Sequence, residues 1–255
     1  MSRHLPFEVI GRADAELPLV MTCEHAASDL PEWSAQNEDQ AFLGDHWGWD
    51  PGAAELTRAL WDEIGGVAVL SRFSRLVCDP NRDPSDPTFI VEKIEDHALS
   101  WNQGLDDQER ERRRVHYHEP YHGAIDQVLK ARMAQKRPPR LLSIHSFTPV
   151  YRGEHRSVEI GVLFDDHEPQ ADALLEALSA TGLRVLPNEP YSGYAGLIHA
   201  ARRHGRQHGL VYLELEIRQD LIATADQITK LSRLIGPAIA EYARGSETVE
   251  NKSPR

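Results

Sequence analysis

Short apolar runs alternate with longer amphipathic stretches along most of the chain. Six runs have the length and composition of buried strands, and the segments between them carry apolar residues at helical spacing. The expected strands cover residues 17–23, 67–73, 141–147, 158–164, 183–186 and 210–217. Strands that alternate with helices are typical of a layered α/β fold, so we predict a largely parallel sheet packed between helices.

Proline and glycine mark the positions where several helices begin. Pro51-Gly52 precedes one helix, a second is expected after Pro120, a third over residues 169–180, and the longest over residues 223–243. Segment 79–104, rich in Pro, Asp and Asn, is too long for a simple connection and is typical of an active-site loop. We therefore expect one domain over residues 1–244, followed by a disordered tail over 245–255.

Composition narrows the class of protein. Among 255 residues, 28 Lys and Arg stand against 40 Asp and Glu, a net charge of −12 that argues against nucleic-acid binding. No apolar run approaches the roughly 20 residues of a membrane span. The first residues show no basic segment followed by an apolar stretch, so we expect no secretion signal. With only Cys23 and Cys78, we expect no disulfide framework and a cytoplasmic protein.

Polar side chains follow or end four of the predicted strands. Ligands of open α/β sheets bind at the carboxyl ends of strands, so we expect these side chains to meet in one site. They are Glu24 and His25 after the first strand, Arg75, Asp79, Asn81 and Arg82 after the second, His145 in the third, and Glu214, Glu216 and Arg218 in the last.

Two histidines and a third residue of this set suit a metal ion. A catalytic zinc site takes three His or carboxylate ligands and leaves one position open. His25 and His145 would supply two of them, and either His46 or Asp50 the third. The residues alone leave that choice open, and they also allow His145 to be a buried, neutral histidine held by the backbone.

Glu214 and Glu216 lie two residues apart on the last predicted strand, so they share a face with Tyr212. A central strand covered by helices would bury both carboxylates, which is costly unless they have partners. In that case Glu216, nearer the strand end, suits a general base that activates water. The alternative is an edge strand with one solvent-exposed face, on which both carboxylates would lie.

Residues 118–122 match the H-E-x-x-H signature of zinc proteases. That chemistry needs a continuous helix, and a proline inside a helix costs about 3 kcal/mol. We therefore expect His118 and Glu119 to precede the helix and reject a protease site, while His122 can still line the cavity. A thiol nucleophile is disfavoured, because buried cysteines at strand ends are mostly inert.

Seven short blocks, taken in order, resemble the N-formylglutamate amidohydrolase family. The likeness covers about residues 18–240. The blocks are Thr-Cys-Glu-His-Ala-Ala (22–27), His-Trp-Gly-Trp-Asp-Pro-Gly-Ala (46–53), Ser-Arg-Leu-Val-Cys-Asp-Pro-Asn-Arg (74–82), Pro-Tyr-His (120–122), Ser-Ile-His-Ser-Phe-Thr-Pro (143–149), Asn-Glu-Pro-Tyr-Ser-Gly (188–193) and Glu-Leu-Glu-Ile-Arg-Gln-Asp-Leu (214–221).

The resemblance implies a mixed, largely parallel sheet sandwiched by helices, similar to phosphorylases and zinc carboxypeptidases. It also implies a metal-dependent hydrolase that cleaves N-formyl-L-glutamate to formate and L-glutamate, a step of histidine breakdown. One zinc ion would be held by His25 and His145. His46 and Asp50 compete as the third ligand, because Ser28 stands where an H-x-x-E ligand pair would have its glutamate.

The resemblance also implies roles for the remaining site residues. Glu216 would take a proton from the metal-activated water and pass it to the leaving amine. The substrate is a small dianion, so arginines are expected to bind its carboxylates. The expected catalytic residues are Glu216 and Arg82, and the expected substrate-binding residues are Arg75, Asn81, Arg218, His122 and Tyr191.

Two alternatives to this function stay open. One is a hydrolase of another N-acyl amino acid or of a short peptide. The other is a catalytically silent protein of the same fold that binds a carboxylate ligand. The expected partner is in each case a small molecule rather than nucleic acid or membrane, and the sequence does not fix the oligomeric state.

Overall fold

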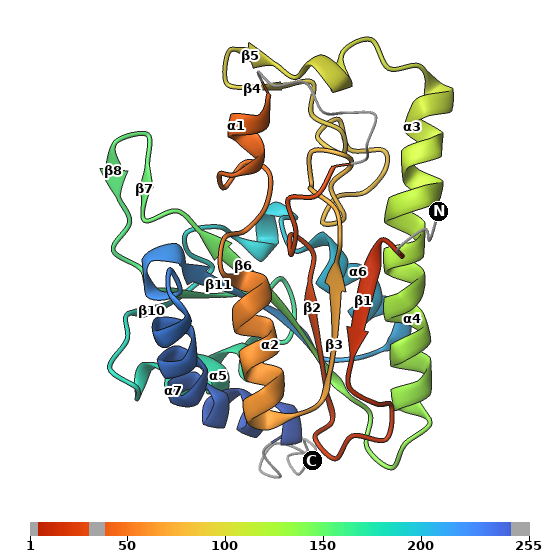
Figure 1. Cartoon of the computed structure of the whole chain (residues 1–255). Coiled ribbons are helices and arrows are strands. Elements are labelled where there is room, and N and C mark those ends of the chain that lie inside the picture. Colours follow the sequence, from red (N-terminus) through yellow and green to blue (C-terminus); the bar gives the residue numbers. More distant parts are fainter. Residues whose placement is uncertain (1–4, 31–38, 246–255) are drawn as a thin grey trace, which may run out of the picture.

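The computed structural model describes residues 5–30 and 39–245 (Figure 1). A seven-stranded sheet has the order β1-β3-β2-β6-β11-β9-β10. Strands β3, β2, β6 and β11 run parallel, while β1 pairs antiparallel with β3 and β9 pairs antiparallel with β11. The sheet is therefore mixed and largely parallel, as predicted. The strands are β1 (Phe7–Ile10), β2 (Leu19–Cys23), β3 (Val67–Ser71), β6 (Arg140–Phe147), β9 (Ile160–Leu163), β10 (Val185–Pro187) and β11 (Tyr212–Arg218).

Helices cover both faces of the sheet (Figure 1). On one face lie α2 (Ala53–Ile64), α5 (Glu168–Ser179) and α7 (Ala225–Arg244), and on the other lie α4 (Glu119–Met133) and α6 (His199–His208). Alternate residues of β11 enter different cores: Leu213 and Leu215 pack in the core with α2, α5 and α7, and Tyr212 in the core with α4 and α6. Polar side chains on either sheet face are therefore buried and need partners.

The six predicted strands correspond to β2, β3, β6, β9, β10 and β11, with ends that differ by at most two residues. Helices α2, α5 and α7 begin close to the predicted positions. Strand β1 and helices α3 (Asp107–Arg113) and α6 were not predicted. The tail predicted to be disordered lies outside the described residues, except for Gly245.

Pro120 lies within a continuous helical segment. The prediction that His118 and Glu119 precede the helix is therefore wrong. Helix α3 continues through the π-helical segment η3 (Arg114–His118) into α4. At this junction the N–H of Glu119 donates to the carbonyl of Arg114, five residues earlier. A π turn holds one residue more than an α turn, and it accommodates the ring and the missing N–H of proline.

Strand β11 lies inside the sheet, between β6 and β9, so the interpretation of a wet edge strand is wrong. Glu216 lies opposite His145 of β6 and Gly161 of β9 in the strand register. Glu214 and Glu216 share the face of Tyr212, as the spacing predicted, and both are buried.

A cap of short elements covers the carboxyl end of β3 (top of Figure 1). The buried Arg113 holds the cap, because its guanidinium donates to the carbonyls of Val77 and Trp101 and to the side chain of Asn102. The long predicted loop is therefore fixed at its base by a buried charge. The cap contains α1 (Gln40–Leu43), the hairpin β4 (Lys93–Ile94) and β5 (His97–Ala98), and the 3₁₀ helix η2 (Ser100–Asn102).

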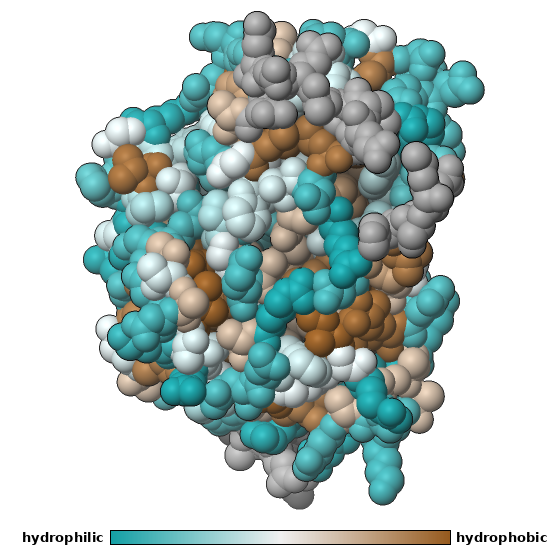
Figure 2. Space-filling view, in the orientation of Figure 1, coloured by the Kyte–Doolittle hydropathy of each residue, from teal (hydrophilic) through white to brown (hydrophobic). Residues whose placement is uncertain are grey.

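Smaller elements complete the fold. They are the hairpin β7 (Val150–Tyr151) and β8 (Glu154–His155) and the 3₁₀ helices η4 (Gly193–Ala195) and η5 (Gln219–Leu221). On the face shown in Figure 2, hydrophilic residues alternate with patches of apolar ones. No helix in the described part of the chain combines the length and the apolar character that crossing a bilayer requires.

Candidate active site

The parallel strands β2, β3, β6 and β11 end at the same edge of the sheet, where a cavity of about 410 Å³ opens. This convergence of strand ends is what the sequence predicted. Most of the predicted site residues line the cavity: His25, His46, Asp50, Arg75, Asn81, Arg82, His145, Tyr191 and Glu216.

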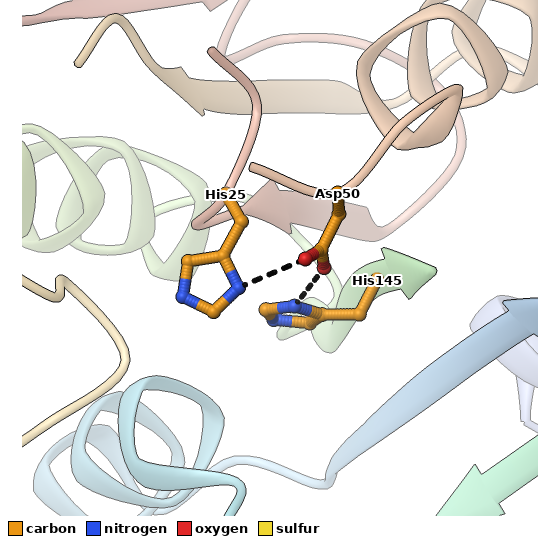
Figure 3. A group of neighbouring side chains, drawn as sticks. All are labelled: His25, Asp50 and His145. Atoms are coloured by element: carbon orange, nitrogen blue, oxygen red, sulfur yellow. Dashed lines mark hydrogen bonds and ion pairs between the residues drawn. The ribbon is translucent and has the colours of Figure 1, made fainter. Parts of the chain in front are cut away.

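His25, Asp50 and His145 point toward one another in this cavity (Figure 3). One carboxylate oxygen of Asp50 lies 3.4 Å from Nδ1 of His25, and the other lies 2.8 Å from Nδ1 of His145. One potential ligand atom from each residue lies within 4.8 Å of the other two, and all three side chains are buried. Two imidazoles and a carboxylate form the donor set that suits a zinc-type cation.

The outer nitrogens of both rings lie against further carboxylates. Nε2 of His25 is 2.7 Å from Asp79, and Nε2 of His145 is 3.0 Å from Glu24. A neutral imidazole carries one N–H and therefore can donate to only one of two carboxylates. The inner nitrogen of His25 lies 3.2 Å from the guanidinium of Arg75, whereas that of His145 faces Asp50, where a cation would replace the missing proton. Outer carboxylates are the usual support of metal-binding histidines. The residues present therefore fit a divalent metal ion.

The backbone around Asp50 explains why this residue, and not His46, joins the two histidines. The N–H of Asp50 donates to the carbonyl of His25, and the N–H of Ser146 donates to the Asp50 carboxylate. Gly52 permits the turn, because its φ is +81° and a Cβ there would lie 2.7 Å from the carbonyl oxygen of Ile222. His46 lines the cavity but pairs with Asp45.

Glu24 is fully buried on the far side of His145. Its carboxylate accepts hydrogen bonds from Ser143, from the hydroxyl of Tyr121 at 3.1 Å and from His145. Burial raises the pKa of Glu24, but the bonds from His145 and Ser143 outweigh it and lower the pKa to about 2. Glu24 is therefore an anion that orients His145. Sequence reasoning noted its place after the strand but gave it no role.

Glu214 and Glu216 bring two more carboxyl groups to the cavity. Within the described residues, one oxygen of each is buried without a hydrogen-bond partner. Burial raises the pKa of Glu214 to about 7 and that of Glu216 well above its ordinary value, and the charge of Asp50 adds to both shifts. Buried carboxyl groups thus surround the two histidines, and this excess of acidic groups favours a bound cation.

Two arginines balance part of this acidity. Arg75 donates to Asp79 over 2.6 Å, and its guanidinium lies 3.9 Å from Asp50. Arg82 donates to the carbonyl of Asn81 and to the hydroxyl of Thr88 and makes no ion pair in the described part of the chain. Both arginines line the cavity and can receive carboxylates of a ligand.

Asn81 connects this loop to α6. Its side-chain oxygen accepts from the N–H of Ala200, and its amide donates to the carbonyl of Leu197 and lies 3.4 Å from Nε2 of His145. The side chain therefore fixes the loop that carries Arg82 as well as lining the cavity.

Arg218 and His122 do not line the cavity, contrary to prediction. Arg218 shares the strand face of Glu216, but its guanidinium pairs with Asp220 and Glu159 and donates to the carbonyls of residues 156–158. His122 lies behind the loop of Asn81 and contacts the carbonyl of Pro80 through Nε2 at 3.0 Å. His118 is 4.2 Å from His122 between ring centroids, yet it contacts a backbone carbonyl as well.

Arg156 is a cation beside the cavity that sequence reasoning missed. It donates to the hydroxyl of Tyr191, and its guanidinium lies over the rings of Phe147, Tyr151 and Tyr191 at 4.8–5.6 Å. These three aromatic residues line the cavity. Arg156 follows the two-residue strand β8, where no hydrophobic pattern marks a strand end.

Comparisons with known proteins identify the family of this chain. Residues 17–223 match the family described as N-formylglutamate amidohydrolase. The chain is similar to the crystal structure of gene product Atu2144 from Agrobacterium tumefaciens, with 34% identity, a TM-score of 0.84, and coverage of 93% of this chain and 96% of that one.

A second solved structure has the same fold. It is N-formylglutamate amidohydrolase from Ralstonia eutropha JMP134, with 20% identity, a TM-score of 0.74, and coverage of 94% of this chain and 99% of that one. No curated protein matches the sequence. Because the family match spans most of the sequence, the chain belongs to the N-formylglutamate amidohydrolase family and is a hydrolase of amide bonds.

Proposed function

We propose that the chain hydrolyses N-formyl-L-glutamate to formate and L-glutamate with one divalent metal ion, zinc. Family membership supports this reaction, and the Ralstonia eutropha structure carries the same name. The observation that carries the proposal is the convergence of His25, Asp50 and His145, each backed by hydrogen bonds, in a cavity that also holds arginines.

His25 and His145 would hold the metal ion through Nδ1, and Asp50 through its carboxylate. When bound, such an ion acts as a Lewis acid on a carbonyl group and makes water acidic enough to attack near neutral pH. Asp79 and Glu24 hold the outer ring nitrogens, which keeps both rings in orientation and raises their basicity as ligands.

Glu216 would serve as the general base. Its carboxyl group lines the cavity, and its residue lies opposite His145 in the strand register. One of its oxygens has no partner among the described residues, and the charge of the bound ion would oppose the burial that raises its pKa, so that the carboxylate could accept a proton. Glu216 would take the proton of the attacking water and transfer it to the amine nitrogen of the leaving glutamate.

The substrate carries two carboxylates, and Arg75 and Arg82 would bind them. A guanidinium binds a carboxylate through two parallel hydrogen bonds, which fixes orientation as well as charge. Arg82 has both of its present hydrogen bonds to neutral oxygens, so a substrate carboxylate would be its ionic partner. A cavity of about 410 Å³ has the size of a small-molecule site.

Formate release from N-formyl-L-glutamate by the purified chain tests this function. N-formyl-L-glutamine is the matched control, since it keeps the size and loses one carboxylate. We expect release from the glutamate substrate, a much higher KM for the glutamine compound, loss of activity with a chelator and recovery with zinc.

Two outcomes would overturn the proposal in different ways. Hydrolysis of N-acetylated amino acids in preference to N-formylated ones would assign the cavity to another acyl group. Binding of N-formyl-L-glutamate without turnover, even after zinc is added, would establish a carboxylate-binding protein.

A further inference from the structure

A second histidine cluster lies between α4 and α6, outside the catalytic cavity. It consists of Asp126 in α4 and of His204 and His208 in α6, and none of the three lines the cavity. One oxygen of Asp126 is 2.9 Å from Nδ1 of His204 and 2.9 Å from Nε2 of His208. One ligand atom from each residue lies within 4.8 Å of the other two.

The cluster has the composition and placement of a metal site. His204 and His208 are four residues apart on one helix, so their side chains share a face, and Asp126 meets them from the neighbouring helix. His204 is fully buried, while the side chain of Asp126 is 18% exposed and opens a path for an ion. Two imidazoles and a carboxylate match the ligands of zinc.

The hydrogen bonds of His204 and His122 require one more proton than two neutral imidazole rings carry. Nδ1 of His204 contacts Asp126, Nε2 contacts Nδ1 of His122 at 2.7 Å, and Nε2 of His122 contacts the carbonyl of Pro80 at 3.0 Å. Three contacts need three protons, but two neutral imidazoles carry two. The two ends of this series, a carboxylate and a carbonyl, are both acceptors and cannot supply the third.

We propose that Asp126, His204 and His208 bind a second divalent metal ion of the zinc class that links α4 to α6. The ion takes the place of the missing proton at Nδ1 of His204. The ring of His204 then donates from Nε2 to His122, which donates from its own Nε2 to Pro80. Every contact in the series is satisfied.

The observed spacing accommodates such an ion after a small adjustment. Ligand atoms about 2.0–2.1 Å from a tetrahedral zinc ion lie about 3.3 Å from one another. The Asp126 oxygen lies 2.9 Å from each histidine nitrogen and accepts a hydrogen bond from the side chain of Gln207 at 3.2 Å, so this partly exposed carboxylate must give up that bond and rotate to admit an ion. The outer nitrogen of His204 is already held by His122, as the outer nitrogens of metal-binding histidines usually are.

Metal stoichiometry of the full chain tests this site. The protein is stripped with a chelator and titrated with Zn²⁺, with bound metal measured per chain, and with Co²⁺, which reports tetrahedral binding in its visible spectrum. Asp126→Asn and His208→Ala remove ligands of the second site. His155→Ala, at an exposed histidine outside both clusters, is the control. Far-UV circular dichroism establishes that each variant is folded.

We expect Asp126→Asn and His208→Ala each to lose one metal equivalent that the unchanged chain and His155→Ala both bind. Zinc should also raise the Tm of the unchanged chain more than that of His208→Ala. His145→Ala separates this site from the proposed catalytic one, because it should keep the equivalent that His208→Ala loses. If the catalytic cavity binds no metal, the unchanged chain should still bind the one equivalent that Asp126, His204 and His208 hold.

Equal metal content in the unchanged chain, Asp126→Asn and His208→Ala would overturn the proposal. In that case the third proton resides on the His122 and His204 pair, as an imidazolium beside Asp126.

Discussion

His25 and His145 each lie between two carboxylates, and this arrangement decides how substitutions in the cavity act. Removing one acidic group changes the charge balance around two rings at once, because Asp50 contacts both Nδ1 atoms. Glu216 differs, since no hydrogen bond holds one of its oxygens among the described residues. A substitution there alters proton transfer more than it alters the ligand set.

Glu216→Gln should keep the metal and lower kcat by about 10²- to 10⁴-fold, because the amide cannot accept a proton from water. The readouts are steady-state formate release and metal content of the purified variant. Glu214→Gln is the matched comparison on the same strand face and should lower kcat much less. The opposite order would assign the base to Glu214.

Arg82→Ala should chiefly raise KM for N-formyl-L-glutamate, because a carboxylate of the substrate loses its ionic partner. Arg218→Ala is the matched control, since Arg218 pairs with Asp220 and Glu159 and does not line the cavity. Steady-state kinetics of both variants are the measurement. Equal KM values in the two variants would remove Arg82 from the binding of substrate.

Whole elements are placed by close contacts that a single methyl group can disturb. Helix α6 approaches β11 at Gly205, where a Cβ would lie 2.1 Å from the ring of Tyr212. The hydroxyl of Tyr212 donates to Asp165, which restricts any movement of that ring. The glycine is therefore required for the packing of α6, the helix that carries His204.

Gly205→Ala should lower the free energy of unfolding by about 1–3 kcal/mol, because the added methyl group overpacks the contact with Tyr212. Gly123→Ala is the matched control in α4, where nothing lies within 4 Å of the added atom. It should stabilise by about 0.5–1 kcal/mol, since alanine favours helix. Urea unfolding measures both, and equal effects would refute the close contact.

Within the cap, Asp39 at the start of α1 connects this helix to β5 and η2, because it receives hydrogen bonds from His97 at 2.7 Å and from the N–H and hydroxyl of Ser100. Burial raises the pKa of Asp39, but the bonds from Ser100 and His97 outweigh it and lower the pKa. A lowered pKa stabilises the fold fully above the unfolded value of about 3.9, and this contribution is lost as pH falls through the folded value.

Asp39→Asn should therefore lower the free energy of unfolding by about 1–2 kcal/mol near neutral pH, and by less near pH 3.5. Urea unfolding at the two pH values measures the difference. Asp14→Asn, in an exposed pair with Arg12, should leave stability nearly unchanged at both. A difference that stays constant with pH would contradict a charged Asp39.

The elements best predicted from the sequence are those that bury large apolar side chains. Strands β2 and β3 read as nearly continuous hydrophobic runs because helices cover both of their faces. Helix α6 escaped prediction because its sequence, HAARRHGRQH, buries alanine, glycine and histidine in place of large apolar side chains. The continuous helix through Pro120 depends on a π turn, which leaves no simple pattern in the sequence.

At the scale of the molecule, the strand order decides which predicted site residues meet. The sequence predicts that His25 and His145 lie at strand ends, and parallel pairing of β2 with β6 makes them neighbours. It could not choose between His46 and Asp50, because that choice depends on backbone contacts from His25 and Ser146. Arg156 lies beside the cavity, directly after a hairpin that no pattern marks.

The central claim is that His25, Asp50 and His145 hold the catalytic metal ion. Metal content and formate release, measured together on Asp50→Ala and His46→Ala, test it most directly, because His46 lines the same cavity without contacting the two histidines. We predict that Asp50→Ala loses one metal equivalent and its turnover, while His46→Ala keeps the metal. Full metal content and turnover in Asp50→Ala, with both lost in His46→Ala, would contradict the account.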